Sequence, residues 1–249
     1  MEGMIFAAGL GTRLRPLTND RPKALVEVAG KPLLEHVIRK MTDAGIRRIV
    51  VNVHHFADQI EDFLDHHLWK AEILVSDERE SLLDTGGGLR KARDMFHPGE
   101  AILIHNVDIF SEVDLSDLIA SHQQKAAFAT LVVRPGGKGR GLRFNSAGLL
   151  KGWENSVTGE QKRVDDEFVL SRHFSFCGIQ VVSAEFLQEM RGRGIFSIID
   201  EYLEQAKHHP ISMYSYNGFF RDLGTPEAIV ELDARMKNHC NPLSGFYVN

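Results

Sequence analysis

Several features that would place this chain in a special class of proteins are absent from its sequence. Only two of its 249 residues are cysteines, Cys177 and Cys240, which is too few for a disulfide scaffold and favours a reducing compartment. The sequence contains no apolar run of about eighteen residues, and Gly9 interrupts the short apolar start, so neither a membrane-spanning helix nor a secretory signal is expected. The net charge of −5 provides no basic excess for nucleic-acid binding. We therefore expect a cytoplasmic protein with no nucleic-acid or membrane partner.

The composition is typical of a globular protein. Apolar residues make up 43% of the chain and charged residues 25%, which is enough apolar surface for a sizeable core. Short apolar runs alternate with segments that are apolar every three or four positions, so strands alternate with helices. This indicates an α/β fold, a Rossmann-like three-layer α/β/α arrangement with a mostly parallel central sheet. In the first half we predict strands over 4–8, 48–53, 72–76, 101–105 and 128–133, and helices over 32–44, 57–66, 89–96 and 115–124.

The pattern changes in the middle of the chain. Glycines and polar residues gather between residues 135 and 173, which we interpret as a small inserted region of β-hairpins and loops, with a disordered loop as the alternative. No linker is apparent, so residues 1–249 are expected to form one domain with this insertion. Beyond it we predict strands over 174–182, 211–216 and 219–222, and helices over 198–206 and 226–237.

The first predicted strand leads into a glycine-rich segment. Residues 9–18 read Gly-Leu-Gly-Thr-Arg-Leu-Arg-Pro-Leu-Thr, and residues 22–25 read Pro-Lys-Ala-Leu. Glycine has no Cβ, so backbone N–H groups can approach a phosphate closely, and the nearby Arg13, Arg15 and Lys23 can neutralise its charge. The segment therefore predicts a site for a nucleoside polyphosphate.

Two common phosphate-binding motifs do not fit this segment. The dinucleotide-binding fingerprint needs a third glycine where Leu14 stands, and the P-loop needs Gly-Lys-Ser/Thr where Gly11 is followed by Thr12. The longer string, together with Lys-Pro-Leu at 31–33, instead resembles the signature of the sugar-1-phosphate nucleotidyltransferases. The likeness runs from about Met4 to Leu232 and is greatest to the short members that act on muramic-acid or mannose 1-phosphates.

The resemblance implies an enzyme that joins a nucleoside triphosphate to a sugar 1-phosphate and releases pyrophosphate. In that reaction Arg13 would hold the leaving phosphates, and Lys23 would neutralise charge on the transferring phosphoryl group. The triphosphate contacts that the resemblance implies come from Ala8, Gly9, Gly11, Thr12, Arg13 and Lys23.

Asp108 follows the predicted strand over 101–105, at the edge of a parallel sheet where ligands bind. A carboxylate beside a triphosphate needs a cation between them, and Mg²⁺ takes such oxygen ligands. Asp222 precedes Gly-Thr-Pro and a predicted helix. Taken alone, either aspartate is equally well a turn or cap residue. The resemblance implies that Asp108 and Asp222 both hold the metal, with Mn²⁺ as a substitute, and that Asp108 is catalytic.

The segment from Asp84 to Leu89 contains three successive glycines before a predicted helix. Such a segment can expose N–H groups to a flat base or a ribose, although a flexible helix entry would look the same. The resemblance places Thr85, Gly86 and Gly87 against the nucleoside. Asn106, close to Asp108, is expected to hold this loop or the ribose.

The expected sugar-binding residues are Glu154 and Gly178. Phe-Cys-Gly-Ile at 176–179 resembles the strand that packs a glycine backbone against the sugar, and Glu154 would accept hydrogen bonds from its hydroxyls. The family often has Glu-Lys-Pro here, whose lysine grips the sugar phosphate, whereas this chain has Glu-Asn-Ser. The residues that could replace that lysine are Lys151, Lys162 and Arg163.

We thus predict a Mg²⁺-dependent sugar-1-phosphate nucleotidyltransferase. Two alternatives remain: a nucleotidyltransferase for a non-sugar acceptor such as phosphocholine, and a nucleotide-sugar sensor without turnover. The sequence leaves open the base, the sugar and the oligomeric state. The tail over 238–249, with Phe246 and Tyr247, is expected to pack on the core or on a partner.

Overall fold

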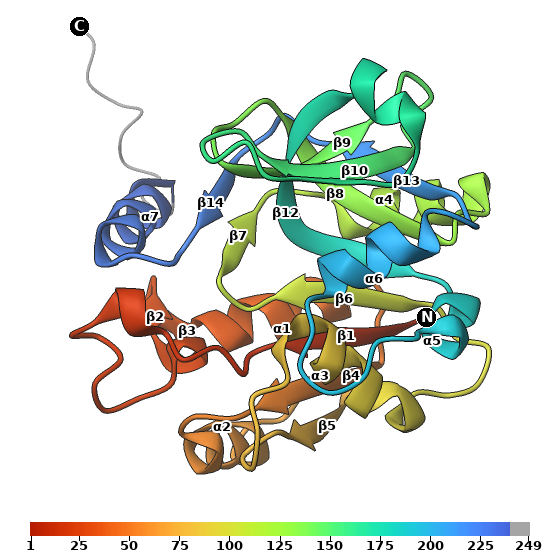
Figure 1. Cartoon of the computed structure of the whole chain (residues 1–249). Coiled ribbons are helices and arrows are strands. Elements are labelled where there is room, and N and C mark those ends of the chain that lie inside the picture. The colour runs from red at the N-terminus through yellow and green to blue at the C-terminus, as the bar shows by residue number, and fades with distance from the viewer. Residues whose placement is uncertain (240–249) are drawn as a thin grey trace, which may run out of the picture.

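The computed structural model describes residues 1–239, so the predicted packing of Phe246 and Tyr247 lies outside the described residues. Four parallel strands form one end of its ten-stranded sheet (Figure 1). They are β1 (Glu2–Phe6), β4 (Arg48–Val53), β5 (Glu72–Asp77) and β6 (Ile102–Asn106), in the spatial order β5-β4-β1-β6. Because all four run in the same direction, the residues that follow β1, β4 and β6 meet at one edge.

The antiparallel part of the sheet begins at β12 (Arg172–Val182). The second half of β12 pairs with β6, and its other edge pairs with β8 (Ala129–Pro135), which in turn pairs in parallel with β13 (Ile211–Ser215). The first half of β12 extends past the end of β6 and pairs with β9. Strand β12 therefore connects the parallel core to the predicted insertion.

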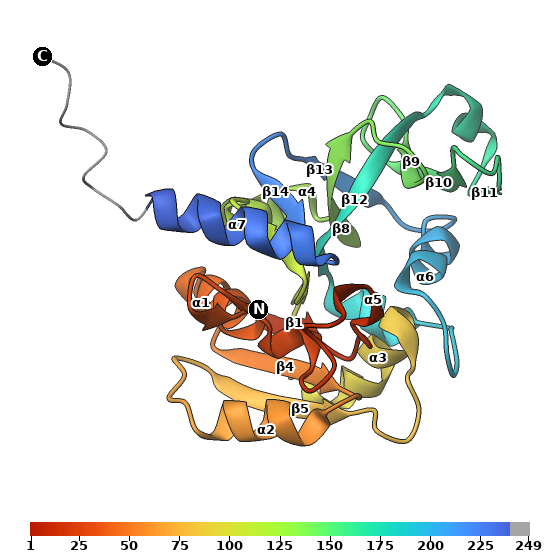
Figure 2. The same cartoon turned by 90° about the vertical axis from the view of Figure 1, so that its left-hand side faces the viewer.

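The region over 135–173 forms hairpins, as predicted. Its strands are β9 (Arg140–Phe144), β10 (Leu150–Asn155) and β11 (Gln161–Arg163), joined as successive antiparallel neighbours. They continue the sheet beyond β12 and lie together to one side of the parallel core (Figure 2). The alternative of a disordered loop is excluded for this segment.

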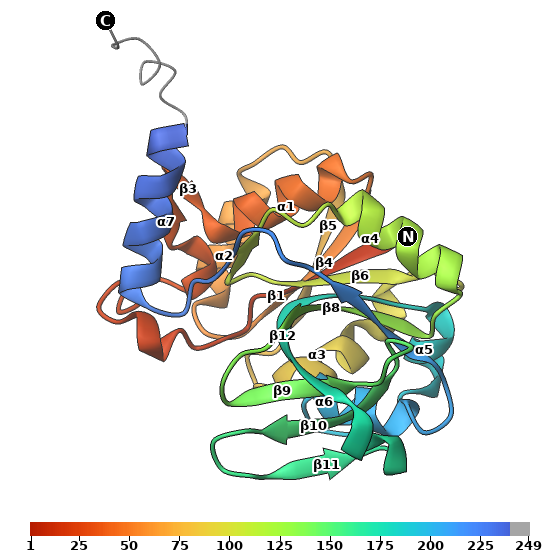
Figure 3. The ribbon, with the colours of Figure 1, turned by 90° about the horizontal axis from the view of Figure 1, so that it is seen from above.

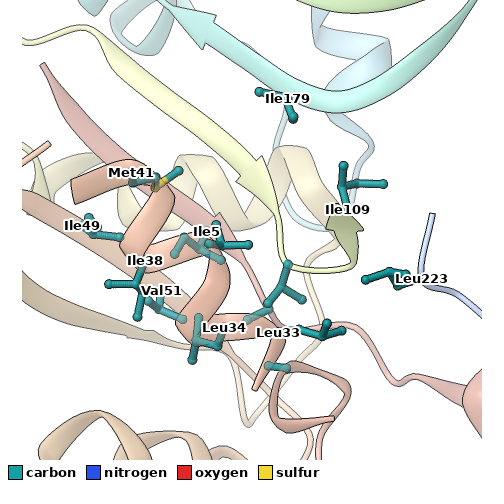
Figure 4. Packing of buried hydrophobic residues seen from close by; sticks show 14 of the residues in the cluster. Ile5, Leu33, Leu34, Ile38, Met41, Ile49, Val51, Ile109, Ile179 and Leu223 are labelled. Carbon is teal, nitrogen blue, oxygen red and sulfur yellow. The ribbon is translucent and has the colours of Figure 1, made fainter. Parts of the chain in front are cut away.

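Helices cover both faces of the parallel strands, which confirms the α/β/α prediction (Figure 3). Helix α1 packs its apolar stripe, including Leu34, Ile38 and Met41, against Ile49 and Val51 (Figure 4). On that face lie α1 (Leu33–Asp43), α2 (Ala57–Asp65), α4 (Leu115–Lys125) and α7 (Pro226–His239), and on the other lie α3 (Asp84–Ala92), α5 (Ala184–Glu189) and α6 (Ile198–Gln205). None of the helices within residues 1–239 is long and apolar enough to cross a membrane.

The predicted elements differ from the structure mainly around the glycines and at short elements. Helix α3 begins at Asp84, whereas the prediction for this helix began at Leu89 and was wrong at its start. Helix α5, capped by Ser183, was not predicted. Three short strands outside the insertion were also not predicted: β2 (Glu27–Val28), β3 (Lys31–Pro32) and β7 (Ile109–Ser111).

Two histidines are buried in the core without charge. His105 on β6 is 1% exposed and donates from Nδ1 to the carbonyl oxygen of Asn106 at 2.7 Å. His122 on α4 is 5% exposed, with Nδ1 3.0 Å from the Thr130 hydroxyl. Burial lowers the pKa of each imidazole to about 4, and the nearby Lys40 charge adds to the effect at His105.

These histidines are expected to make the free energy of unfolding decrease as the pH falls through the mildly acidic range. Between pH 6.5 and 4 the unfolded chain protonates both imidazoles and the folded protein does not, so the free energy of unfolding falls as the pH is lowered. Each contributes at most about 1.4 kcal/mol per pH unit in that window. Urea unfolding at pH 7, 6 and 5 measures the slope, and His122→Gln should reduce it. An unchanged slope in that variant would show that His122 does not contribute to the pH dependence of stability.

Candidate active site

A cavity of about 570 Å³ opens at the edge where the parallel strands end. Its wall is formed by residues 6–13 after β1, by Asn52 on β4, by residues 106–108 after β6, and by Gly224 before α7. The glycine-rich segment and Asp108, predicted from distant parts of the sequence, thus line one cavity. This is the position in which open parallel sheets bind ligands.

The glycine-rich segment forms a turn held by its own contacts. Gly11 has a left-handed backbone, with φ of 63°, and its carbonyl accepts a hydrogen bond from the Thr18 hydroxyl at 2.9 Å. A Cβ at Gly11 would also lie 3.1 Å from the Lys23 side chain. Ala8, Gly9 and Thr12 complete this wall of the cavity. The turn therefore exposes backbone to the cavity and packs against the predicted catalytic lysine.

Lys23 and Asp108 form an ion pair inside the cavity. Lys23 is 8% exposed, and its Nζ contacts Oδ2 of Asp108. Arg13 also lines the cavity and makes no ion pair with any residue between 1 and 239. The site thus holds one cation that is balanced by a carboxylate and a second that is available to an anion.

Asp222 lies beside Asp108 because two short strands pair. In β14 (Phe220–Asp222), Asp222 is opposite Ile109 of β7, and the Leu223 N–H donates to the Asp108 carbonyl at 2.8 Å. Ile109 and Leu223 are neighbours in the core beneath this edge (Figure 4). The structure therefore brings together the two aspartates that are 114 positions apart, although Asp222 lies outside the cavity wall.

Gly224 connects the second aspartate to Arg13. The Asp222 Oδ1 accepts a hydrogen bond from the Gly224 N–H at 2.8 Å, and a Cβ at Gly224 would lie 2.7 Å from the Arg13 guanidinium. Glycine at this position lets Arg13 lie against the backbone next to Asp222. The arrangement gathers two carboxylates and two cations around one opening.

The residues fit a hard divalent cation. Asp108 and Asp222 supply carboxylate oxygens, and no group of three or more His, Cys, Asp or Glu side chains suited to a metal occurs within residues 1–239. Mg²⁺ is typically held by one or two carboxylates and completes its shell with water and substrate phosphates. The two aspartates at this cavity suit such an ion.

The glycines of α3 have a different role from the one predicted. The N–H groups of Gly86 and Gly87 both donate to the Phe196 carbonyl, at 2.9 and 3.2 Å, so they are not exposed to a ligand. A Cβ at Gly86 would lie 2.4 Å from the Phe196 ring. These glycines permit close packing of the segment before α6. Of the predicted nucleoside contacts in this segment, Thr85 lines the cavity, and its Oγ1 accepts from the Ile198 N–H at 3.0 Å.

Sequence reasoning missed a buried polar pair in the cavity wall. Asn52 accepts from the Ala7 N–H at 2.8 Å and donates to Glu78 Oε1 at 2.7 Å, and Glu78 Oε2 accepts from the Leu83 N–H at 3.1 Å. Asn52 is 3% and Glu78 1% exposed. The pair ties the glycine-rich turn to the loop before α3. An asparagine at the end of an otherwise apolar strand was the available signal.

An apolar part of the wall was also missed. Ile195, which lies between α5 and α6, lines the cavity and is 67% exposed, and Leu82 lies in the same wall. No sequence pattern pointed to these residues. Asn106, which was predicted, does line the cavity.

The predicted sugar-binding residues Glu154 and Gly178 both lie outside the wall of this cavity. Gly178, with φ of 66°, forms a bulge in β12, and a Cβ there would lie 2.8 Å from the Asn106 amide nitrogen. Glu154 is bound by Arg143 and by His173, each at 2.9 Å. Burial raises the pKa of Glu154, but these two partners outweigh it and hold the pKa below its ordinary value.

The three residues considered as replacements for the missing lysine are engaged locally. Lys151 pairs with Asp165 at 2.7 Å, and Lys162 pairs with Asp200 at 2.6 Å. Arg163 lies over the Phe168 ring, 5.0 Å from its centre. Each of them already has a partner on the insertion or on α6.

Comparison with known proteins identifies the class. Residues 2–141, more than half of the chain, match the family described as "Nucleotidyl transferase", and the chain belongs to this family. The predicted family is therefore confirmed. Among its relatives, the N-acetylmuramate alpha-1-phosphate uridylyltransferase of Caulobacter vibrioides is 49% identical over 108 residues, which cover 42% of this chain and 44% of that protein.

A second relative aligns over nearly its whole length. The protein of the same name from Neisseria meningitidis serogroup B is 27% identical over 240 residues, 94% of this chain and 97% of its own. Among solved structures, a UDP-glucose pyrophosphorylase from Acinetobacter baumanii superposes with a TM-score of 0.81 at 17% identity, over 97% of this chain and 95% of that one. This likeness confirms the fold.

Proposed function

We propose that the protein transfers a nucleoside monophosphate from a nucleoside triphosphate to a sugar 1-phosphate, giving a nucleoside diphosphate sugar and pyrophosphate. The observation that carries the proposal is the convergence of Arg13, Lys23, Asp108 and Asp222 around the cavity beside the glycine-rich turn. A sensor has little use for two paired carboxylates at a phosphate site, which argues against binding without turnover.

The first pair of substrates to test is UTP with N-acetylmuramate 1-phosphate. The relative named for this activity in Caulobacter vibrioides supports the choice through its 49% identity. GTP with mannose 1-phosphate is the second pair, because the N-terminal signature also resembles that branch. Phosphocholine is the acceptor that tests the alternative of a non-sugar substrate.

The proposed cofactor is Mg²⁺, with Mn²⁺ as a substitute. Asp108 and Asp222 would hold it. When bound, Mg²⁺ supplies positive charge that neutralises phosphate oxygens and orients them for in-line displacement.

In the proposed reaction an oxygen of the sugar 1-phosphate bonds to the α-phosphorus of the nucleotide. The bond from this phosphorus to the bridging oxygen breaks, and the electron pair leaves with pyrophosphate. The attacking phosphate is already ionised at neutral pH, so the chain needs no strong general base. Catalysis then consists of positioning and charge neutralisation.

Each cation of the site has a distinct part in this scheme. Arg13, together with the backbone of residues 9–12, would bind the leaving β- and γ-phosphates, since its guanidinium is unpaired within residues 1–239. Lys23 would stabilise charge on the transferring phosphoryl group from its position beside Asp108. Thr85 and Asn106, both in the cavity wall, would contact the nucleoside.

We also propose that residues 1–249 make up a single nucleotidyltransferase domain in which the segment over 135–173 is an insertion. The continuity of β9, β10 and β11 with the central sheet supports this. A cytoplasmic location follows from the proposed nucleotide substrates. The oligomeric state is left open.

The test is pyrophosphate release in the presence of Mg²⁺, with UTP, GTP, CTP, ATP and dTTP crossed against a panel of sugar 1-phosphates and phosphocholine. We expect release that requires one nucleotide and one sugar 1-phosphate together, and that stops when EDTA removes the metal. Release with phosphocholine alone would favour the non-sugar acceptor. Nucleotide binding without release from any pair would contradict the proposal.

A further inference from the structure

Arg134, near the end of β8, is a half-buried cation without an ionic partner. Its side chain makes no hydrogen bond or ion pair with any residue from 1 to 239, and the guanidinium carbon lies 5.5 Å from the centre of the Phe220 ring. A partly buried guanidinium has lost part of its hydration and gains most from an anion that binds it. An anion is the obvious missing partner.

Register places Arg134 on the same side of the sheet as the predicted sugar-binding residues. Arg134 is directly opposite Ser175 on β12, so both side chains point to one face. His173, two positions along β12, points to that face as well and contacts Glu154. The face therefore carries Arg134 together with Glu154 and its two partners.

The charge of this face is not balanced locally. The Glu154 carboxylate is already shared by Arg143 and His173, both at 2.9 Å, so it does not offset Arg134. Arg134 therefore has no carboxylate partner on this face; Arg163, which also has none, lies over the Phe168 ring instead. A negative group on the ligand, in addition to its phosphate, would supply the missing partner of Arg134.

The position of Arg134 suits a group on the sugar better than its reacting phosphate. The reacting phosphate has to reach the two aspartates, whereas Arg134 lies over Phe220, which precedes Asp222 by two positions on β14. Arg13 and Lys23 line the cavity together with Asp108, and Arg134 is not part of its wall. The guanidinium is thus set apart from the two cations that we assign to the phosphates.

We propose that Arg134 binds a carboxylate carried by the acceptor sugar, and that the enzyme therefore selects sugar 1-phosphates with an acidic substituent. This inference rests on the proposed function. The planar fork of arginine matches a carboxylate through two parallel hydrogen bonds, which a lysine cannot make. The lactyl ether of N-acetylmuramate is one carboxylate of this kind.

The experiment compares two acceptors that differ only in that group, N-acetylmuramate 1-phosphate and N-acetylglucosamine 1-phosphate. In the full chain, Arg134→Gln should lower kcat/KM for the carboxylated sugar at least tenfold more than for the neutral one, mainly through KM. Arg134→Lys should fall between Arg134→Gln and wild type. Arg172→Gln, which removes an exposed arginine of β12, is the control and should change neither value.

Four other outcomes would count against the inference. Equal losses with both acceptors, or no loss with either, would overturn it. A wild-type enzyme that uses only sugar 1-phosphates without an acidic group would overturn it and leave the transferase activity standing. No pyrophosphate release from any nucleotide and acceptor would overturn the proposed function as well. Thermal unfolding at the wild-type temperature shows that a variant is folded.

Discussion

Asp108→Asn is expected to lower kcat by at least about a hundredfold while the protein still folds. The change keeps the shape of the side chain but removes the charge that pairs with Lys23 and that would hold Mg²⁺ beside Asp222. Loss of one preorganised hydrogen-bond donor at a reacting centre costs about 2.7–4 kcal/mol of barrier, a factor of about one hundred to one thousand, and by analogy we expect the loss of this charge to cost as much.

The measurement is steady-state pyrophosphate release with saturating substrates, across a Mg²⁺ titration. Asp117→Asn, which neutralises an exposed carboxylate on α4, is the matched control and should keep wild-type turnover. Far-UV circular dichroism and the melting temperature confirm folding. Near-wild-type turnover in Asp108→Asn would refute the assignment of this residue.

Lys23→Met should cause a loss of similar size, and its combination with Asp108→Asn should not add to it fully. Lys23 is buried against Asp108, so the two side chains act as one unit, and removal of either disturbs the other. We expect the double variant to be at least tenfold more active than the product of the two single effects predicts.

A double-mutant cycle of kcat/KM for the nucleotide measures this coupling. Lys70→Met, at an exposed lysine between α2 and β5, serves as the control for loss of a positive charge. Full additivity of the two single effects would show that Lys23 and Asp108 act independently, contrary to the geometry of the site.

The sequence predicted most of the core fold because its signals were local and agreed with one another. The apolar stripe of α1 and the side-chain cap of Asp114 on α4 each determine an element from neighbouring residues. Gly86 and Gly87 misled the prediction, because glycine disfavours helix by itself. Only the fold shows that Phe196 occupies the space where a side chain would be.

The candidate site likewise combines residues that local motifs predicted with residues that only the fold brings there. Gly11 and Asp108 stand in short motifs that follow strands, so their position at the end of the sheet was predictable from the sequence. Ile195 approaches the cavity from a loop that no local pattern connects to it. The face on which Arg134 lies is determined by its pairing opposite Ser175. This pairing joins two distant segments, so it could not be predicted from either segment alone.

The contact between Phe196 and the start of α3 has a practical consequence for work with fragments. The Phe196 carbonyl accepts hydrogen bonds from the N–H groups of Gly86 and Gly87, and the preceding residue, Ile195, forms part of the cavity wall. A fragment limited to the family-matched residues 2–141 would carry the glycine-rich turn and Asp108 but would lack this wall and Asp222. Attempts to isolate a minimal nucleotide-binding half, or to split the protein into complementing pieces, should therefore keep the segment from α5 to the start of α7 with the N-terminal half.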